Sequence, residues 1–530
     1  MNQTLSRIIG TSALALLASV ALNLLPLQLK AQTIGPSLIM DIPSAQVKTA
    51  PQDEGPGIAA VEGLVDIPFQ PGMDPEEYKR RKEEANQLQT QRLRPTPQSR
   101  MILRPLEPIA DIGFEGLNMF ESPAGPFLLT PPDTHGAVGK TQFVQIVNSA
   151  LAVYDKETGV RLKRVSLNAF FGHPEPPPNA NFPHPGVLFD PRVVYDRVWN
   201  RWVVTAEAFQ ESSTVQFHFI GVSLTDDATG PFFIYPINVT VTPGEFWEYP
   251  QLGMDQDAVV ITANIFGARS GSDVLSIAKA RLYNGLSLRI PRFTGLPFNT
   301  APPIVLDDNS STFLITSRPG TSNVELRALT NSSRPDAAGI TAPTLVNVGF
   351  YTIPPDARQP GTGLRLDTLD ARFQNASTQT GSSLFNVHTI DFSGFATPRW
   401  YEIDTGANSV LQRGIFFGTE VSDDFNPSIT INDDKDVFVT WSSTNPGTRD
   451  EPPYQAQIRA SGRLSTDPPG EISAGSVIFE SPTFYTQFRW GDYSAITVDP
   501  TIPNCAWGVN EKIDSPSVWG SFIFRTCFPQ

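Results

Sequence analysis

Polar residues recur along the chain just before runs that alternate like β-strands, and their types could together bind a polar ligand. Carboxylates, amides, aromatic rings and guanidinium groups gathered in one place are what a sugar or other polar-ligand site needs. If these runs are neighbouring strands, their side chains converge on one mouth of a channel. The candidates are Asp133, His135, Asp190, Arg192, Tyr249, Gln251, Asn386, His388, Asn426, Ser428, Arg489, Asp492 and Tyr493. The competing interpretation is that the Asp and Asn side chains only satisfy backbone groups between neighbouring units.

Glycoside hydrolysis is the chemistry that such carboxylates could carry. It needs two carboxyl groups that face each other across the substrate at a defined separation. Asp133, Asp190 and Asp492 could supply them, although the sequence does not fix their spacing. A sialidase-like site would also need several arginines around a substrate carboxylate. Arg192 and Arg489 are two candidates, and a third is not evident.

Residues 432–436 are the one stretch with a composition that could hold Ca²⁺ through oxygen ligands. This stretch lacks the Gly and the distal Glu of an EF-hand loop, and Lys435 interrupts it, so a plain hairpin turn is favoured. The spacings of zinc sites, the nucleophile elbow, the phosphate-binding loop and the dinucleotide fingerprint do not occur. Apart from possible Ca²⁺, no metal or cofactor is predicted.

A repeated hairpin must position these residues. Its first strand ends in an acidic or amide turn, and a hydrophobic strand follows. The pattern occurs at 189–205, 248–262, 425–441 and 491–509, with weaker copies at 132–147, 303–316 and 384–403. About seven units at this spacing predict an all-β fold, a single β-propeller, in which a closed ring also removes open sheet edges. A pair of β-sandwiches ranks second, because it would not explain the shared hairpin.

The two cysteines are placed to form a disulfide. Residues 506–510 and 520–524 look like strands, and a turn at 514–517 joins them. Pairing that is symmetric about Pro516 sets Cys505 opposite Cys527. Opposed residues in an antiparallel pair lie about 4.5 Å apart between Cα atoms, which a disulfide tolerates. Closing this loop should stabilise the fold by about 3 kcal/mol.

The N-terminal region differs from the rest of the chain. Arg7, an apolar run over 8–29 and a cleavage site after Ala31 predict a signal peptide at residues 1–31. The alternative is an uncleaved anchor, because the run is long enough to cross a bilayer. Residues 32–100 predict a flexible, Pro-rich arm with a solvated helix at 75–93, capped by Asp74. Residues 101–530 would form the propeller.

Charge and export limit the partners. The net charge of −15 disfavours nucleic acid, since phosphate binding needs a basic surface. After removal of the signal peptide, no other segment approaches a membrane span, so no integral membrane domain is expected. The predicted location is therefore extracellular, periplasmic or in the cell envelope, and the predicted partner is a glycan or a protein.

From about Pro131 onward, the chain resembles a family of secreted bacterial proteins, mostly hypothetical, with a predicted β-propeller. The motifs that carry the resemblance are residues 132–139, 153–155, 190–202, 249–261, 366–372, 399–402, 461–468, 489–494 and 505–511. His135 stands where Asn is common, and residues 371–373 are a looser form of the usual segment. The family resembles sialidases in architecture only, and the sialidase Asp box, Ser-x-Asp-x-Gly-x-x-Trp, does not occur. The resemblance implies fold and export but brings no catalytic assignment.

These observations predict an exported propeller that binds a ligand or serves as a scaffold. The alternative is a glycan-active enzyme, a sialidase-like glycoside hydrolase with carboxylates at the channel mouth. Loss of turnover in an Asp variant would distinguish the enzyme from the binding protein.

Overall fold

The computed structural model describes residues 33–52, 63–89 and 106–529, and strands predominate in them. The predicted signal peptide at 1–31 lies outside these residues. The described helices are α1 (Pro75–Gln89), α2 (Leu167–Phe171), α3 (Lys279–Leu282) and the 3₁₀ turn η1 (Met119–Glu121). Within the described ranges, every helix is too short or too polar to cross a bilayer.

Antiparallel groups of four strands follow one another along the first half of the chain. The first group is β7 (His135–Val138), β8 (Gln142–Val147), β9 (Ala150–Asp155) and β10 (Arg161–Ser166). The second is β11 (Leu188–Asp196), β12 (Arg201–Ala208), β13 (Phe217–Ser223) and β14 (Phe232–Asn238). The third is β15 (Glu245–Met254), β16 (Ala258–Gly267), β17 (Gly271–Ala278) and β18 (Leu288–Leu296). The fourth is β19 (Thr300–Ala301), β21 (Ser311–Ser317), β22 (Thr321–Thr330) and β24 (Thr344–Tyr351), with β23 (Gly339–Thr341) also on β22.

The second half of the chain continues in the same way. The fifth group is β27 (Ser377–Thr380), β28 (Ser383–Phe392), β29 (Phe395–Asp404) and β30 (Ser409–Ile415). The sixth is β31 (Asp423–Ile431), β32 (Val437–Asn445), β33 (Tyr454–Arg463) and β34 (Ser476–Glu480). The last is β35 (Ala495–Val498), β36 (Cys505–Ser515) and β37 (Val518–Cys527), completed by β5 (Ile109–Glu115) from the other end of the chain. A separate small pair is β25 (Ala357–Arg358) with β26 (Arg365–Leu366).

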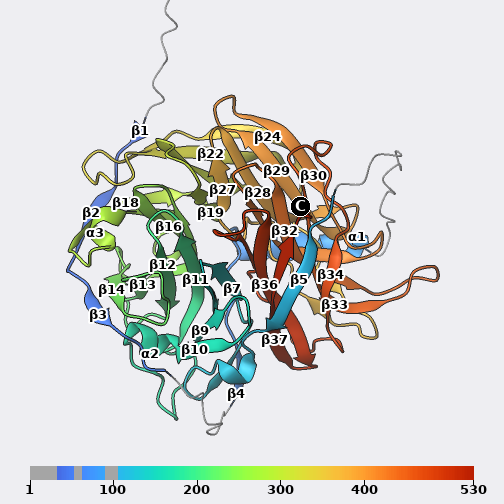
Figure 1. The fold of residues 1–530 in the computed structure, drawn as a ribbon, viewed down its shortest axis with the longest axis horizontal. Helices are drawn as coiled ribbons and strands as arrows, with labels where there is room; N and C mark the ends of the chain where they lie inside the picture. The colour runs from blue at the N-terminus through green and yellow to red at the C-terminus, as the bar shows by residue number, and fades with distance from the viewer. Residues whose placement is uncertain (1–32, 53–62, 90–105, 530) are drawn as a thin grey trace, which may run out of the picture. The chain divides into compact units, whose positions relative to one another are not determined.

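The first strands of six of these groups, together with one further strand, contact one another in a cycle that returns to its start. β7 contacts β11, β11 contacts β15, and β31 contacts β35, which contacts β7 again. Between β15 and β27 lies β20 (Pro303–Val305), which pairs in parallel with both of them, and β27 in turn contacts β31. Figure 1 shows the groups succeeding one another in chain order around the strands of this cycle.

Two of the weaker repeats differ from the sequence prediction. The segment 303–316 is not a hairpin, because β20 pairs with neighbouring groups while β19 pairs with β21. The segment 384–403 forms the second and third strands of its group, β28 and β29, and the first strand is β27. β27 has only four residues, so alternation over so short a run gave no signal.

The described parts of the arm pack against the strand groups. β1 (Thr33–Ile34), β2 (Leu38–Ile42) and β3 (Gln46–Lys48) pair with the outer strands β23, β18 and β14. β4 (Gly63–Asp66) pairs in parallel with β6 (Phe127–Thr130). For these segments the prediction of a free arm is therefore wrong, because short edge pairings of this kind leave no periodic pattern in the sequence.

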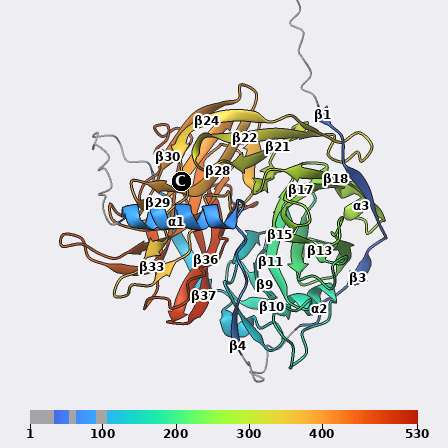
Figure 2. The same ribbon diagram turned by 180° about the vertical axis from the view of Figure 1, so that it is seen from behind.

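Helix α1 begins where the sequence predicted, since the Asp74 carboxylate accepts hydrogen bonds from the Glu76 and Glu77 amides. It is docked rather than solvated. Lys82 is buried, and its ammonium group donates to the carbonyls of Pro354 and Leu369 and lies 3.0 Å from a carboxylate oxygen of Asp356. A helix that docks through a polar side chain has no apolar stripe, which explains the wrong prediction. Figure 2 shows α1 lying across this side of the sheets.

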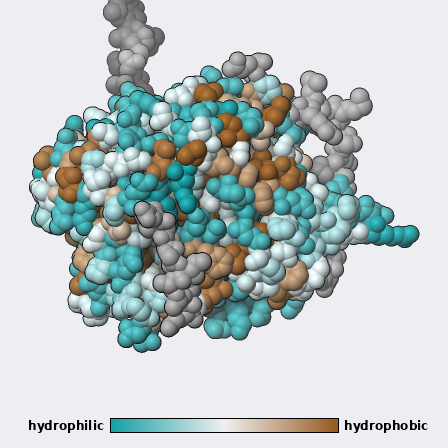
Figure 3. Space-filling view, turned by 60° about the horizontal axis from the view of Figure 1, so that its bottom comes forward, coloured by the Kyte–Doolittle hydropathy of each residue, from teal (hydrophilic) through white to brown (hydrophobic). Residues whose placement is uncertain are grey.

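Hydrophobic side chains fill the spaces between the sheets. Seven of the eight tryptophans are fully buried, whereas Trp199 is 50% exposed. The surface visible in Figure 3 mixes hydrophilic and hydrophobic residues, without a large uninterrupted hydrophobic area.

Aspartates at the ends of first strands have two functions. In each of Asp196, Asp255 and Asp499, one carboxylate oxygen accepts hydrogen bonds from backbone amides of the turn that follows the strand. The other oxygen bonds the adjacent sheet: Asp196 accepts from the Tyr283 hydroxyl and Asp255 from the Thr312 hydroxyl. The turn that the sequence singled out therefore closes a hairpin and ties two sheets together.

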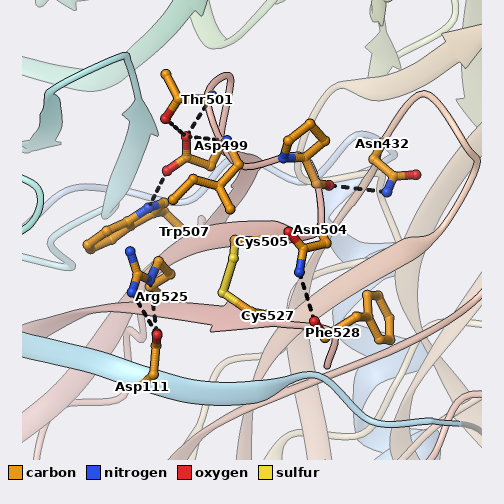
Figure 4. Close-up of a disulfide and its surroundings, with 12 residues drawn as sticks. Asp111, Asn432, Asp499, Thr501, Asn504, Cys505, Trp507, Arg525, Cys527 and Phe528 are labelled. Atoms are coloured by element: carbon orange, nitrogen blue, oxygen red, sulfur yellow. Dashed lines mark hydrogen bonds and ion pairs between the residues drawn. A yellow bond between two sulfur atoms is a disulfide. The ribbon is translucent and has the colours of Figure 1, made fainter. Parts of the chain in front are cut away.

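The last sheet is tied to the first in the same way. The ammonium group of Lys156, which follows β9, lies 2.8 Å from a carboxylate oxygen of Asp499, and both side chains are buried. The Trp507 indole also donates to this carboxylate, as Figure 4 shows beside the disulfide. Cys505 lies opposite Cys527 and is bonded to it. The predicted hairpin and disulfide are confirmed.

Replacing Cys505 and Cys527 by Ala should lower the free energy of unfolding by about 3 kcal/mol, because the unfolded chain regains the entropy of the open loop. Urea unfolding of the variant and the parent measures this difference. Treating the parent with a reductant should reproduce it, and an unchanged midpoint would contradict the expectation.

Lys156→Met should cost about 3 to 5 kcal/mol of stability, because it leaves the carboxylate of Asp499 buried without its counter-charge. The matched control is Arg197→Met, which breaks the exposed pair with Asp433 and should cost less than about 1 kcal/mol. Chemical denaturation of both variants tests the difference, and adding Asp499→Asn to Lys156→Met should recover part of the loss. Equal losses for the two single variants would show that the buried pair does not hold the sheets together.

Candidate functional site

The predicted site residues are aimed inward by a repeated irregularity in the first strands. β11, β15 and β31 each contain a bulge at a residue followed by proline. These residues are Asp190, Tyr249 and Asn426, with φ of 48°, 56° and 48°. A bulge redirects side chains, and a positive φ is uncommon for residues other than glycine. The three positions therefore share one special backbone geometry in the first half of their strands.

Two of the three special positions are tied to a neighbouring sheet, and for Asn426 the backbone amide donates to Thr389 Oγ1 at 3.1 Å. The backbone amide of Asp190 donates to Asn148 Oδ1 at 2.9 Å. The amide of Asp492 donates to Asp133 Oδ1 at 2.8 Å, and Asn148 Nδ2 donates to Asp133 Oδ2 at 2.7 Å. The carboxylate of Asp133 thus satisfies backbone and amide groups between sheets, as the competing structural interpretation expected.

The three aspartates nevertheless form one electrostatic unit. Burial raises the pKa of Asp133 to about 7, and the nearby charge of Asp190 adds to this shift. Burial also raises the pKa of Asp492 to about 7, against the opposing effect of Arg489, whose Nη2 lies 2.7 Å from Asp492 Oδ1. The pKa of Asp190 is raised to about 6 by burial and then by the charge of Asp492. Near neutral pH the three carboxyl groups are therefore only partly ionised.

Aromatic rings and guanidinium groups stack beside these carboxyls. The guanidinium carbon of Arg192 lies 3.4 Å from the ring centroid of Tyr493, whose ring is 5.4 Å from that of Tyr249. Arg372 lies 4.2 Å from the centroid of Tyr249. Arg372 is the third arginine that sequence reasoning did not find, although it belongs to the motif 366–372. Its carboxylate partner is Asp370, at 2.7 Å.

Arg192 also ties the cluster to the segment that precedes β27. Its Nη1 donates to Asn375 Oδ1 and its Nη2 to the carbonyl oxygen of Gln374, both at 3.0 Å. Gln374 in turn donates to Asn426 Oδ1 at 2.7 Å. Sequence reasoning missed Gln374 and Asn375, because they lie in an irregular loop before the short strand β27.

The arm packs on the arginines of this cluster. The Phe69 ring centroid lies 4.8 Å from the guanidinium carbon of Arg372 and 5.2 Å from that of Arg489. The carbonyl of Gln70 accepts from Arg372 at 2.9 Å, and the amide of Gly72 donates to Asp370 at 2.9 Å. Most of the predicted residues thus come together in a buried cluster rather than at an open mouth. Ser428 instead lines a pocket, His388 bonds the Ala371 carbonyl and the Tyr401 hydroxyl, and there is one further exception.

That exception is His135, which lines a pocket farther along the first strands. The pocket has a volume of about 330 Å³. Burial lowers the pKa of His135 well below its ordinary value, so the imidazole is neutral, and the Val193 amide faces its Nδ1 at 3.4 Å. The apolar walls are formed by Val194, Leu252, Met254, Ile304, Ile429, Ile431 and Ile496. Neutral polar groups among them include Asn375, Thr378, Ser428 and Thr430, and charged side chains also line the pocket: Asp196, Arg197, Asp255, Lys279, Asp307 and Asp308.

The stretch 432–436 forms a hairpin turn. Asn432 Oδ1 accepts the backbone amides of Asp434 and Asp436, and Asp433 pairs with Arg197 at 2.6 Å. Within the described ranges, no group of three or more His, Cys, Asp or Glu is arranged to hold a metal ion.

Comparison with known proteins gives distant structural likenesses. No protein-family model and no curated protein matches the chain. A protein of unknown function from Dyadobacter fermentans has a TM-score of 0.36 at 10% identity, covering 64% of this chain and 94% of that one. The Penicillium chrysogenum α-L-arabinanase in complex with arabinobiose has a TM-score of 0.35 at 8% identity, and the match covers 67% of this chain and 99% of the arabinanase. The Trypanosoma rangeli sialidase has a TM-score of 0.30 at 12% identity, and the match covers 64% of this chain and 54% of the sialidase.

The aspartate cluster predicts an unusual pH dependence of stability. Because these carboxyls have raised pKa values when folded, the folded state binds more protons than the unfolded state, where Asp has a pKa of about 3.9. The free energy of unfolding should therefore fall as the pH rises from about 4 to about 7. Asp190→Asn should make this fall smaller by about 3 kcal/mol, because the pKa of Asp190 is raised to about 6 and each pKa unit corresponds to about 1.36 kcal/mol.

Unfolding curves at pH 4.5, 6 and 7.5 measure the effect. The exposed Asp308→Asn is the control and should leave the pH profile unchanged. The same slope in the parent and in Asp190→Asn would contradict the prediction.

Proposed function

We propose that the chain is an exported binding protein, built as a single seven-bladed β-propeller with its ligand site in the channel. The blades are the seven groups of strands, and three observations support them. The first strands of six groups, together with β20, contact one another in a cycle. The strands within each group are antiparallel, and β5 completes the last group from the N-terminal side. A ring closed by strands from both ends leaves no open break between first and last blades.

The pocket of about 330 Å³ is the observation that carries the binding function. Small-molecule sites are concave, mostly apolar and supplied with a few polar groups that fix orientation. Here the apolar side chains come from several first strands, while hydroxyls of Thr378, Ser428 and Thr430 lie among them. The site suits a small ligand with an apolar body and one or two hydrogen-bonding groups.

The aspartate cluster favours a structural role over hydrolysis in this state of the protein. Asp133 accepts from a backbone amide and an amide side chain, and Asp492 pairs with Arg489. Phe69 covers the arginines beside them. A sugar between two of these carboxyls would have to displace the arm.

A glycan-active enzyme is the second candidate, and the raised pKa values of Asp133 and Asp492 are the observation that favours it. General acids often have pKa values near the working pH. Under this alternative, the arm leaves the cluster before substrate enters.

Export is part of the same proposal. The apolar N-terminal run and the disulfide suit an oxidising compartment outside the cytoplasm. The acidic net charge suits a ligand or protein partner other than nucleic acid. We place the protein outside the cell or in the cell envelope.

Ala376→Trp tests the pocket. Ala376 lines the pocket and is only half-buried, so a larger side chain there fills the cavity without displacing a packed core. The fluorescent probe 1-anilinonaphthalene-8-sulfonate should bind the parent and lose at least about tenfold in affinity in the variant. The melting temperature is the control for folding. Equal affinity in both proteins would place the probe elsewhere and count against a ligand site in the channel.

Fluorogenic glycosides test the enzyme alternative. We expect the purified mature protein to give no turnover. Turnover that disappears in Asp492→Asn, while the variant remains folded, would replace the binding function by glycoside hydrolysis.

A further inference from the structure

A second cavity lies where the arm meets the strand groups, at the opposite end of the first strands from the channel pocket. It has a volume of about 260 Å³. Phe69 and Tyr78 of the arm line it on one side, and Asp367, Phe488 and Arg489 line it on the other. The cavity is therefore formed jointly by two parts of the chain that are far apart in sequence.

Arg489 has buried donors that nothing in the described protein satisfies. Its side chain is only 9% exposed, and its Nη2 bonds Asp492 at 2.7 Å. Its Nε and Nη1 have no hydrogen-bond partner, and the nearest carboxylate oxygen, from Asp367, lies 3.7 Å from Nη1. A buried donor without a hydrogen-bond partner destabilises the folded protein. The two unbonded N–H groups of Arg489, a residue that lines the cavity, therefore indicate an acceptor supplied from outside.

Aromatic rings form the walls of the same cavity. The rings of Phe69 and Tyr78 lie 5.4 Å apart, and the guanidinium of Arg489 lies 5.2 Å from the centroid of Phe69. Phe488 is 51% exposed and so offers its ring to solvent at the rim. An exposed aromatic ring beside convergent hydrogen-bonding groups can bury the apolar face of a ligand while polar groups orient its hydroxyls.

The charges lining the cavity balance. Three cations, Lys79, Lys82 and Arg489, face three carboxylates, Glu83, Asp356 and Asp367. Such a set presents both donors and acceptors but no net field, so it does not favour an ion of either sign. A ligand that is itself neutral and carries both donors and acceptors fits best.

We propose that this cavity binds the ring of a neutral sugar. One face of the ring packs on Phe488, and its hydroxyls accept from Arg489 and donate to Asp367. The site exists only while the arm is docked, because Phe69 and Tyr78 belong to it. This proposal does not depend on a ligand in the channel pocket.

A printed array of neutral and acidic glycans, probed with the full mature protein, identifies a sugar, which is then titrated by calorimetry. We expect binding to neutral glycans, and Phe488→Ala should weaken it at least about tenfold. Phe350→Ala is the matched control, because Phe350 is 63% exposed and lies outside the cavity. It should leave the affinity unchanged.

Ala376→Trp separates the two proposals, since it fills the channel pocket and should not alter sugar affinity. Tyr78→Phe removes a hydroxyl from the cavity wall without truncating the ring and should weaken binding by a smaller factor. An array without neutral hits, a preference for acidic glycans, or equal affinity in the parent and folded Phe488→Ala would each overturn the proposal. A sugar lost with Ala376→Trp instead would assign it to the channel.

Discussion

The fold depends on carboxylates that each serve a turn and a neighbouring sheet. Asp196, Asp255 and Asp499 bond their own turn with one oxygen and the adjacent sheet with the other. Hydrophobic packing between sheets is non-directional, so by itself it would not fix how far one sheet is rotated or shifted against the next. Buried, directional bonds at these three strand ends supply that register. They also explain why the acidic turn recurs in a chain whose other sequence features vary.

At the opposite ends of the first strands, residues with a strained backbone fix the register between neighbouring sheets. Asp190, Tyr249 and Asn426 have positive φ, and side chains of the preceding sheet accept the amides of Asp190 and Asn426. Polar residues that look like a binding site therefore serve largely to join sheets. What this arrangement leaves unsatisfied, above all the free donors of Arg489, is the more informative sign of a ligand.

Patterns that repeat locally were readable from the sequence, and contacts between distant segments were not. The hairpins β11–β12, β15–β16 and β31–β32, the helix start at Asp74 and the disulfide follow from alternation, turn chemistry and pairing symmetry. The convergence of the predicted residues follows once the strands are neighbours. The contacts of Arg372 with Tyr249 and of Phe69 with both arginines join residues far apart in the chain. Neither periodicity nor composition predicts these contacts. In the sequence, the buried Lys82 cannot be distinguished from an ordinary surface lysine.

The last sheet contains β5 from one end of the chain and β35 to β37 from the other. A growing polypeptide that emerges from its N-terminus cannot complete this sheet until residue 527 has been made and delivered. Until then β5 lacks β37, the strand with which it pairs in this sheet, and the first and last sheets cannot meet. This topology postpones the completion of the last sheet until β35 to β37 have been synthesised, long after β5.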